Sequence, residues 1–210
     1  MDSKDKQKFQ QKANDSFKTK LNMYLFSKSL KNELDKTDLK DFKYFSIDEG
    51  LVKLYTAEYW QYEMEHRING GLSNEEIYQR IGKFQVERKE DIENLRMDYY
   101  NSFLSETFTI ADQFVNRLKD KNTPCEYCKI TISQVIELAN NYKLFKKNYR
   151  GWSLEIDRKD SNYEYTPENC VMACYWCNNA KTDEFTYEEF KEIGQAIQKI
   201  WEKRLKNDNI

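Results

Sequence analysis

The chain has 210 residues, a net charge of −2 and an isoelectric point near 5.7, so it is not a strongly basic nucleic-acid-binding protein. A local basic stripe would still suffice for phosphate contacts. No stretch approaches the roughly 18 apolar residues of a membrane span, and the polar N-terminus lacks the apolar core of a signal peptide. With two prolines, 39% hydrophobic residues and 33% charged residues, we expect a helix-rich globular protein of one or two domains.

The region from residue 1 to about 120 is predicted to be helical. Apolar residues recur at helical spacing from Phe17 to Leu34. The first forty residues also carry an excess of lysine, which fits either a solvated helix face or a contact with a nucleic-acid backbone. We therefore expect these helices to select a substrate or a protein partner, and a homodimer through them is an open alternative.

Two more helical stretches are expected before residue 120. One runs from about Ser46 to His66 and stops at Asn69-Gly70-Gly71. The next begins at the capping-box sequence Ser73-Asn-Glu-Glu76. Its apolar pattern does not decide between one long helix and two helices that are broken near Gly82 or Thr107.

Four of the five cysteines form two Cys-x-x-Cys pairs, Cys125/Cys128 and Cys174/Cys177. Four thiolates in this spacing predict a closed, structural Zn²⁺ site with no open coordination position for catalysis. Metal ligation also indicates a reducing compartment, so we expect a cytoplasmic protein. The fifth, Cys170, is expected to be a small buried residue.

The region from 121 to 210 is expected to form one module around these cysteines. The pattern predicts a short helix over 133–139, a short strand over 153–156, and a last helix that starts at the capping box Thr186-Tyr-Glu-Glu189. The apolar stripe of the last helix is expected to comprise Phe190, Ile193, Ile197 and Ile200. A hairpin followed by a helix with the second cysteine pair is a ββα arrangement in a treble-clef zinc fold. The predicted fold class is α+β, predominantly helical.

The segment between the cysteine pairs has a polar pattern that is more specific than either pair alone. A strand ending in Ile156-Asp157-Arg158 is followed by Tyr165-Thr-Pro-Glu-Asn169 and then by Cys174-x-x-Cys177-Asn178-x-x-Lys181. This pattern resembles the HNH, or His-Me finger, endonuclease family, and most of all its four-cysteine branch found in phages and mobile elements. The resemblance covers residues 122 to 192 and implies metal-dependent hydrolysis of nucleic acid, with DNA preferred over RNA.

The resemblance also implies roles for individual residues. Asp157 and Asn178 match the positions that bind the catalytic divalent ion, and hard oxygen ligands suit Mg²⁺ or Mn²⁺. Asn169 matches the residue that fixes the shape of the loop. Arg158, Lys159 and Lys181 are expected to contact nucleic-acid phosphates.

Arg158 occupies the position at which the family carries its general base, a histidine. Arginine stays protonated and cannot activate water, although it can grip a phosphate. The only histidine, His66, has no motif around it. Other candidates for the base are Asp160, Tyr163, Tyr165 and a metal-bound hydroxide.

Three functions therefore stay open at this point: an active nuclease with another base, a catalytically silent zinc module that binds DNA or RNA, and a structural or interaction protein braced by zinc.

Overall fold

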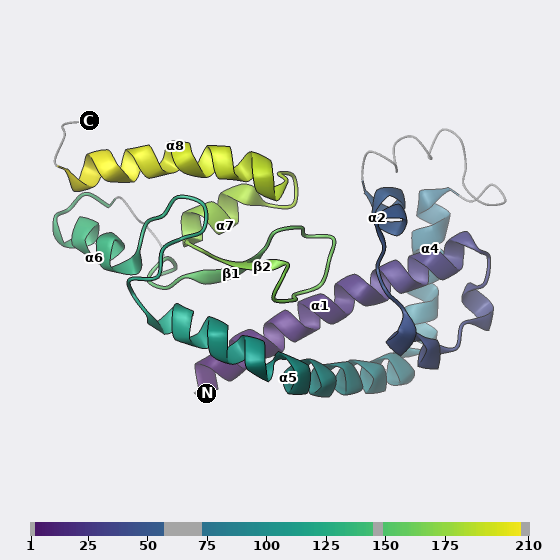
Figure 1. Ribbon diagram of the computed structural model, residues 1–210. Helices are drawn as coiled ribbons and strands as arrows, with labels where there is room; N and C mark the ends of the chain where they lie inside the picture. The colour runs from purple at the N-terminus through teal and green to yellow at the C-terminus, as the bar shows by residue number, and fades with distance from the viewer. Residues whose placement is uncertain (1–2, 57–72, 145–148, 207–210) are drawn as a thin grey trace. The chain divides into compact units, whose positions relative to one another are not determined.

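The computed structural model describes residues 3–56, 73–144 and 149–206 (Figure 1). The fold is predominantly helical with a small two-stranded sheet, so the predicted α+β class is confirmed. None of the described helices is both long enough and apolar enough to cross a membrane. The predicted helix from Ser46 is described only as α2, Glu49–Tyr55, and its expected end at His66 lies outside the described residues.

The chain divides into two compact units. One comprises residues 1–6, 106–161 and 165–210, and we call it the cysteine unit. The other comprises residues 7–105 and 162–164, and we call it the helical unit. Helix α5 runs through the boundary at residues 105 and 106.

The elements of the N-terminal half are helices and short 3-10 turns. They are α1 Ser3–Leu30, η1 Leu34–Lys36, η2 Leu39–Tyr44, α2 Glu49–Tyr55, α4 Asn74–Glu87 and α5 Lys89–Lys119. Local capping sets several of their starts: the Asp48 carboxylate accepts from the Leu51 N–H at 2.7 Å, and the predicted capping box of Ser73 and Glu76 is present. The long helical stretch is broken at Arg88, the C-cap of α4, and at neither Gly82 nor Thr107.

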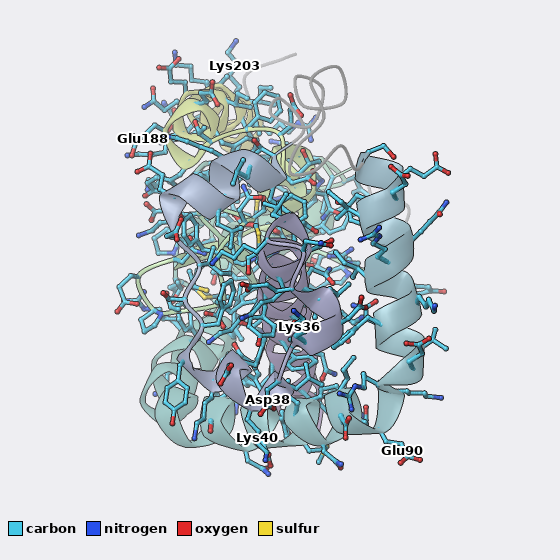
Figure 2. The ribbon with its side chains drawn as sticks, turned by 90° about the vertical axis from the view of Figure 1, so that its right-hand side faces the viewer. Lys36, Asp38, Lys40, Glu90, Glu188 and Lys203 are labelled. Atoms are coloured by element: carbon cyan, nitrogen blue, oxygen red, sulfur yellow. The ribbon has the colours of Figure 1, made fainter. Side chains whose placement is uncertain are left out.

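Aromatic rings fill the core of the helical unit. Phe42 packs edge-on against Phe17 and Tyr24, with ring centroids 5.5 and 5.7 Å apart. Tyr163, from the short segment that belongs to this unit, packs against the same core. Charged residues lie on the outside, and Figure 2 shows Lys36, Asp38 and Lys40 projecting from the η1–η2 segment. Several lysines of the first forty residues therefore occupy a solvated face.

The cysteine unit is built around a β-hairpin and three helices: α6 Ile132–Asn140, β1 Glu155–Arg158, β2 Cys170–Ala173, α7 Tyr175–Lys181 and α8 Tyr187–Leu205. The strands are antiparallel, with Asp157 opposite Val171 and Arg158 opposite Cys170. Helix α7 lies beside β1, and α8 lies beside α6 (Figure 1). The capping box at Thr186 begins α8 as predicted.

The buried face of α8 differs from the predicted stripe. Phe190 is buried as predicted and Ile193 and Ile197 are half-buried, but Ile200 is 48% exposed, and the other buried residues are Gly194 and Trp201. The reason is a close approach at Gly194, where a Cβ atom would lie 2.7 Å from the Cβ of Tyr127. The helix therefore turns its glycine toward the first cysteine pair, and the tryptophan follows on the same face because it lies two turns further along.

Candidate functional site

The four paired cysteines converge on one point in the cysteine unit. Their sulfur atoms all lie within 4.8 Å of one another, and all four residues are buried. Cys125 and Cys128 flank a tight turn in which the Lys129 N–H donates to the Cys125 carbonyl at 3.0 Å. Cys174 is the N-cap of α7, and Cys177 lies in the first turn of that helix. This cluster can bind a metal such as zinc, as the spacing predicted.

The electrostatics of the cluster favour a bound cation. Hydrogen bonds from Cys128, Cys174 and Cys177 lower the pKa of the Cys125 thiol. Hydrogen bonding with Cys125, together with burial, raises the pKa of Cys174 and of Cys177. Four thiolates this close together would repel one another, so ionisation of all four requires a compensating cation. Cys170 is buried in β2 and lies outside the cluster, in agreement with its expected role.

Asp157 is at the centre of a buried polar network. It is 9% exposed, and its Oδ2 accepts a hydrogen bond of 2.7 Å from the hydroxyl of Tyr127. The Lys181 ammonium lies 3.8 Å from the same oxygen and donates to the Arg158 carbonyl at 2.9 Å. Burial, followed by the negative charge of Asp157, raises the pKa of Tyr127, so this tyrosine remains a proton donor.

The loop after β1 is held by the side chain of Asn169. Its Nδ2 donates to the Asp160 carbonyl at 2.9 Å, and its Oδ1 accepts from the Asp160 N–H at 3.0 Å. The Lys159 ammonium donates to the Glu168 carbonyl at 2.7 Å. The Arg158 guanidinium lies over the ring of Tyr165, 4.7 Å from its centroid. This part of the chain therefore has a defined shape.

Asn178 contacts β1 through a residue that the motif does not include. Its Nδ2 donates to Oε2 of Glu155 at 2.6 Å. The Arg150 guanidinium contacts both oxygens of Glu155, at 2.8 and 2.9 Å, and lies over the ring of Tyr175. The first residue of β1 and the second turn of α7 are thus joined by a carboxylate.

The predicted site residues divide into three groups. Asp157, Arg158, Asp160 and Asn169 lie together in the β1–β2 hairpin and its loop. Asn178 lies on the helix that packs beside β1. Lys181 differs from its predicted role as a phosphate contact, because the residue is 1% exposed and its ammonium is bonded within the protein.

Tyr127, Glu155 and Arg150 were missed by the motif. One signal for Glu155 was available, because residues two apart on a strand share a face and Glu155 is two residues before Asp157. Tyr127 lies inside the first Cys-x-x-Cys pair, where an aromatic residue is equally compatible with simple packing.

Comparison with known proteins gives one partial similarity. No family model matches the chain, and no curated protein matches it. Among solved structures, the chain is similar to the rare-cutting HNH restriction endonuclease PacI, at 30% sequence identity and a TM-score of 0.38. The similarity covers 45% of this chain and 65% of the other, so the chain spans less than two thirds of that nuclease. A functional assignment therefore has to come from the residues of the site.

Proposed function

We propose that the chain is a metal-dependent endonuclease of the HNH type, which hydrolyses phosphodiester bonds in DNA. The observation that carries this proposal is the loop after β1, in which Asn169 bonds both main-chain groups of Asp160. This is the shape-holding role that the motif assigns to Asn169. Two residues with suitable chemistry flank this loop along the chain: Asp157 on β1, and Asn178 on the helix that packs beside β1.

The four cysteines would hold a structural zinc ion. A set of four thiolates leaves no coordination position open, so the ion would fix the ends of the turn, of β2 and of α7 without taking part in hydrolysis. The polar residues of the hairpin would supply the chemistry.

Asp157 and Asn178 fit a second, divalent ion because they offer a carboxylate and an amide oxygen. Metal-binding side chains are normally hydrogen-bonded by the protein as well, which orients them. Here Tyr127 and Lys181 contact Oδ2 of Asp157, and Glu155 contacts Nδ2 of Asn178. When bound, Mg²⁺ or Mn²⁺ would offset the negative charge of the phosphate and of the leaving oxygen.

Arg158 would bind the phosphate and Asp160 would accept the proton of the attacking water. A guanidinium offers paired N–H donors, so Arg158 can bind a phosphate. Because it stays protonated, Arg158 cannot accept a proton from water. The Tyr165 ring beneath Arg158 limits the positions that its guanidinium can take. Asp160 is half-buried in the loop, and Asn169 fixes its main chain. Losing the family's histidine base typically costs about 10²–10⁴-fold, and a carboxylate is an intrinsically weaker base than an imidazole, so we expect a slow nuclease.

A silent DNA-binding module is the second candidate, and one observation favours it. Asp157 is 9% exposed and already has Lys181 as a positive partner, so the fold can compensate its charge without a divalent ion. In that case Arg158 and Lys159 would bind phosphates.

Cleavage of DNA by the zinc-loaded chain distinguishes the nuclease from the silent DNA-binding module. Supercoiled plasmid and single-stranded DNA are incubated with Mg²⁺ or Mn²⁺, for wild type, Asn178→Ala and the control Asn179→Ala. Asn179 is the exposed neighbour on the same helix. We expect cutting by wild type and by the control, and a loss of at least about 100-fold in Asn178→Ala. Binding without cutting, with affinity that falls steeply with salt, would instead support the silent module.

A further inference from the structure

We propose that Glu155 is a positioning residue that selects the orientation of the Asn178 amide, so that its oxygen rather than its nitrogen is available to a divalent ion. Arg150 holds Glu155 in place for this task. The inference rests on the proposed function, because it concerns the same ion, and it adds two residues that the motif lacks.

The hydrogen bond between the two side chains fixes the amide. An asparagine side chain has a donor end and an acceptor end, and rotation by half a turn exchanges them. An ionised carboxylate accepts hydrogen bonds and cannot donate them. Since Nδ2 of Asn178 lies 2.6 Å from Oε2 of Glu155, the carboxylate favours this orientation and opposes the reverse one. The acceptor end, Oδ1, is then directed away from Glu155.

Glu155 is itself held by the Arg150 guanidinium. Two nitrogens of Arg150 contact its Oε1 at 2.8 and 3.2 Å, and the Nη2 atom also contacts Oε2 at 2.9 Å. The guanidinium lies 5.0 Å from the centroid of the Tyr175 ring, and Tyr175 is the first residue of α7. The series of contacts therefore begins and ends on α7, and it passes through the first residue of β1. An arrangement that is anchored on both elements can hold the amide still.

The two residues proposed to hold the ion are supported in the same way. Asp157 is held through Oδ2 by Tyr127 and Lys181, and Asn178 is held through Nδ2 by Glu155. Glu155 and Asp157 alternate with Ile156 on β1, so they belong to one face of the strand. In each side chain the protein thus holds one terminal atom, Oδ2 of Asp157 or Nδ2 of Asn178, and the other terminal atom, Oδ1, is the candidate ligand.

The test measures the affinity of the zinc-loaded full chain for Mn²⁺. The electron paramagnetic resonance signal of free Mn²⁺ gives the amount that is not bound. The variants are Glu155→Ala, Glu155→Gln and the double variant Glu155→Ala with Asn178→Asp. We expect Mn²⁺ binding to weaken by about 10-fold or more in Glu155→Ala, the usual size for loss of a residue that orients a ligand. Glutamine offers both a donor and an acceptor and so permits either orientation of the Asn178 amide, and Glu155→Gln should therefore also weaken Mn²⁺ binding by more than about threefold.

The double variant tests the orientation of the amide most directly. An aspartate at position 178 has two equivalent oxygens and no wrong orientation, so it should recover most of the Mn²⁺ affinity that Glu155→Ala loses. Binding by the double variant that is no better than in Glu155→Ala would mean that amide orientation is not what Glu155 supplies, and it would overturn the inference. Unchanged binding in Glu155→Ala would overturn it too, while leaving the proposed function intact. If wild type binds no Mn²⁺ beyond the zinc, both the inference and the proposed ion site fail.

Discussion

The Tyr127 hydroxyl donates a hydrogen bond of 2.7 Å to the Asp157 carboxylate, and this contact joins the first cysteine pair to β1. Tyr127 lies between Cys125 and Cys128, and its ring packs at 4.9 Å on Phe190 of α8. The cysteine cluster, the hairpin and the last helix therefore share one buried residue. Substitution of Tyr127 should therefore change the hydrogen bonding of Asp157 while all four cysteines remain.

The substitution Tyr127→Phe removes only the hydroxyl. Because Asp157 is buried, the loss of a hydrogen bond to its charge should lower the free energy of unfolding by about 1.5–3 kcal/mol. Urea denaturation measures the change, and zinc content per chain should remain as in wild type. An unchanged denaturation midpoint would show that the contact contributes nothing to the fold.

The substitution Lys181→Met tests whether Lys181 has a structural role in the fold or binds a phosphate. Removal of the ammonium leaves the Asp157 carboxylate buried without its cation, which should destabilise the protein by about 3 kcal/mol. The salt dependence of DNA binding should keep its slope, because a lysine that is 1% exposed neutralises no phosphate. Arg158→Gln is the comparison, and its slope should decrease by about one. A lower slope in Lys181→Met would contradict the buried role.

Two glycines give opposite expectations for the same change to alanine. At Gly194 the new Cβ would lie 2.7–2.8 Å from the Cβ, carbonyl carbon and carbonyl oxygen of Tyr127, so Gly194→Ala should destabilise by about 1–3 kcal/mol. At Gly82, inside α4, the Cβ would meet nothing within 4 Å. Gly82→Ala should therefore stabilise its helix by about 0.5–1 kcal/mol. Thermal denaturation of both variants checks the contrast, and equal effects of the same sign would refute the packing argument.

Tyr24 should make the helical unit sensitive to alkali. Burial, followed by the charges of Asp41 and Asp38, raises the pKa of this tyrosine to about 12. The unfolded chain loses the proton near pH 10 while the folded unit keeps it, so stability is complete below about pH 10 and falls as pH rises toward 12. Denaturation between pH 8 and 11.5 measures this, and Tyr24→Phe should show a smaller decline. Parallel curves for the two proteins over this range would exclude Tyr24 as the cause.

Local sequence was a good guide wherever the interaction is local. The capping boxes at Ser73 and Thr186 follow from a spacing of three residues, and both are present. The four-cysteine cluster joins pairs 46 residues apart, and it was predictable because each Cys-x-x-Cys pair supplies half of a four-thiolate metal site. The predicted stripe of α8 was right for Phe190 and wrong for Ile200, because the close approach of Gly194 to Tyr127 depends on two segments that are far apart in the chain.

The buried network and the Glu155 contact could not be predicted for the same reason. Lysine is usually exposed, and only the packing of α7 on β1 places the Lys181 ammonium beside Asp157. The Glu155–Asn178 bond joins residues 23 apart. The motif identifies which residue types lie in the hairpin, but the partners of each side chain depend on the tertiary fold.

The most direct test of the account is cleavage of supercoiled plasmid with Mn²⁺ by wild type and by Asp157→Ala, with zinc content measured in both. We predict that wild type nicks the plasmid, and that the variant loses the activity while it retains its zinc. Absence of nicking by wild type, or undiminished nicking by the zinc-loaded variant, would contradict the proposed role of Asp157.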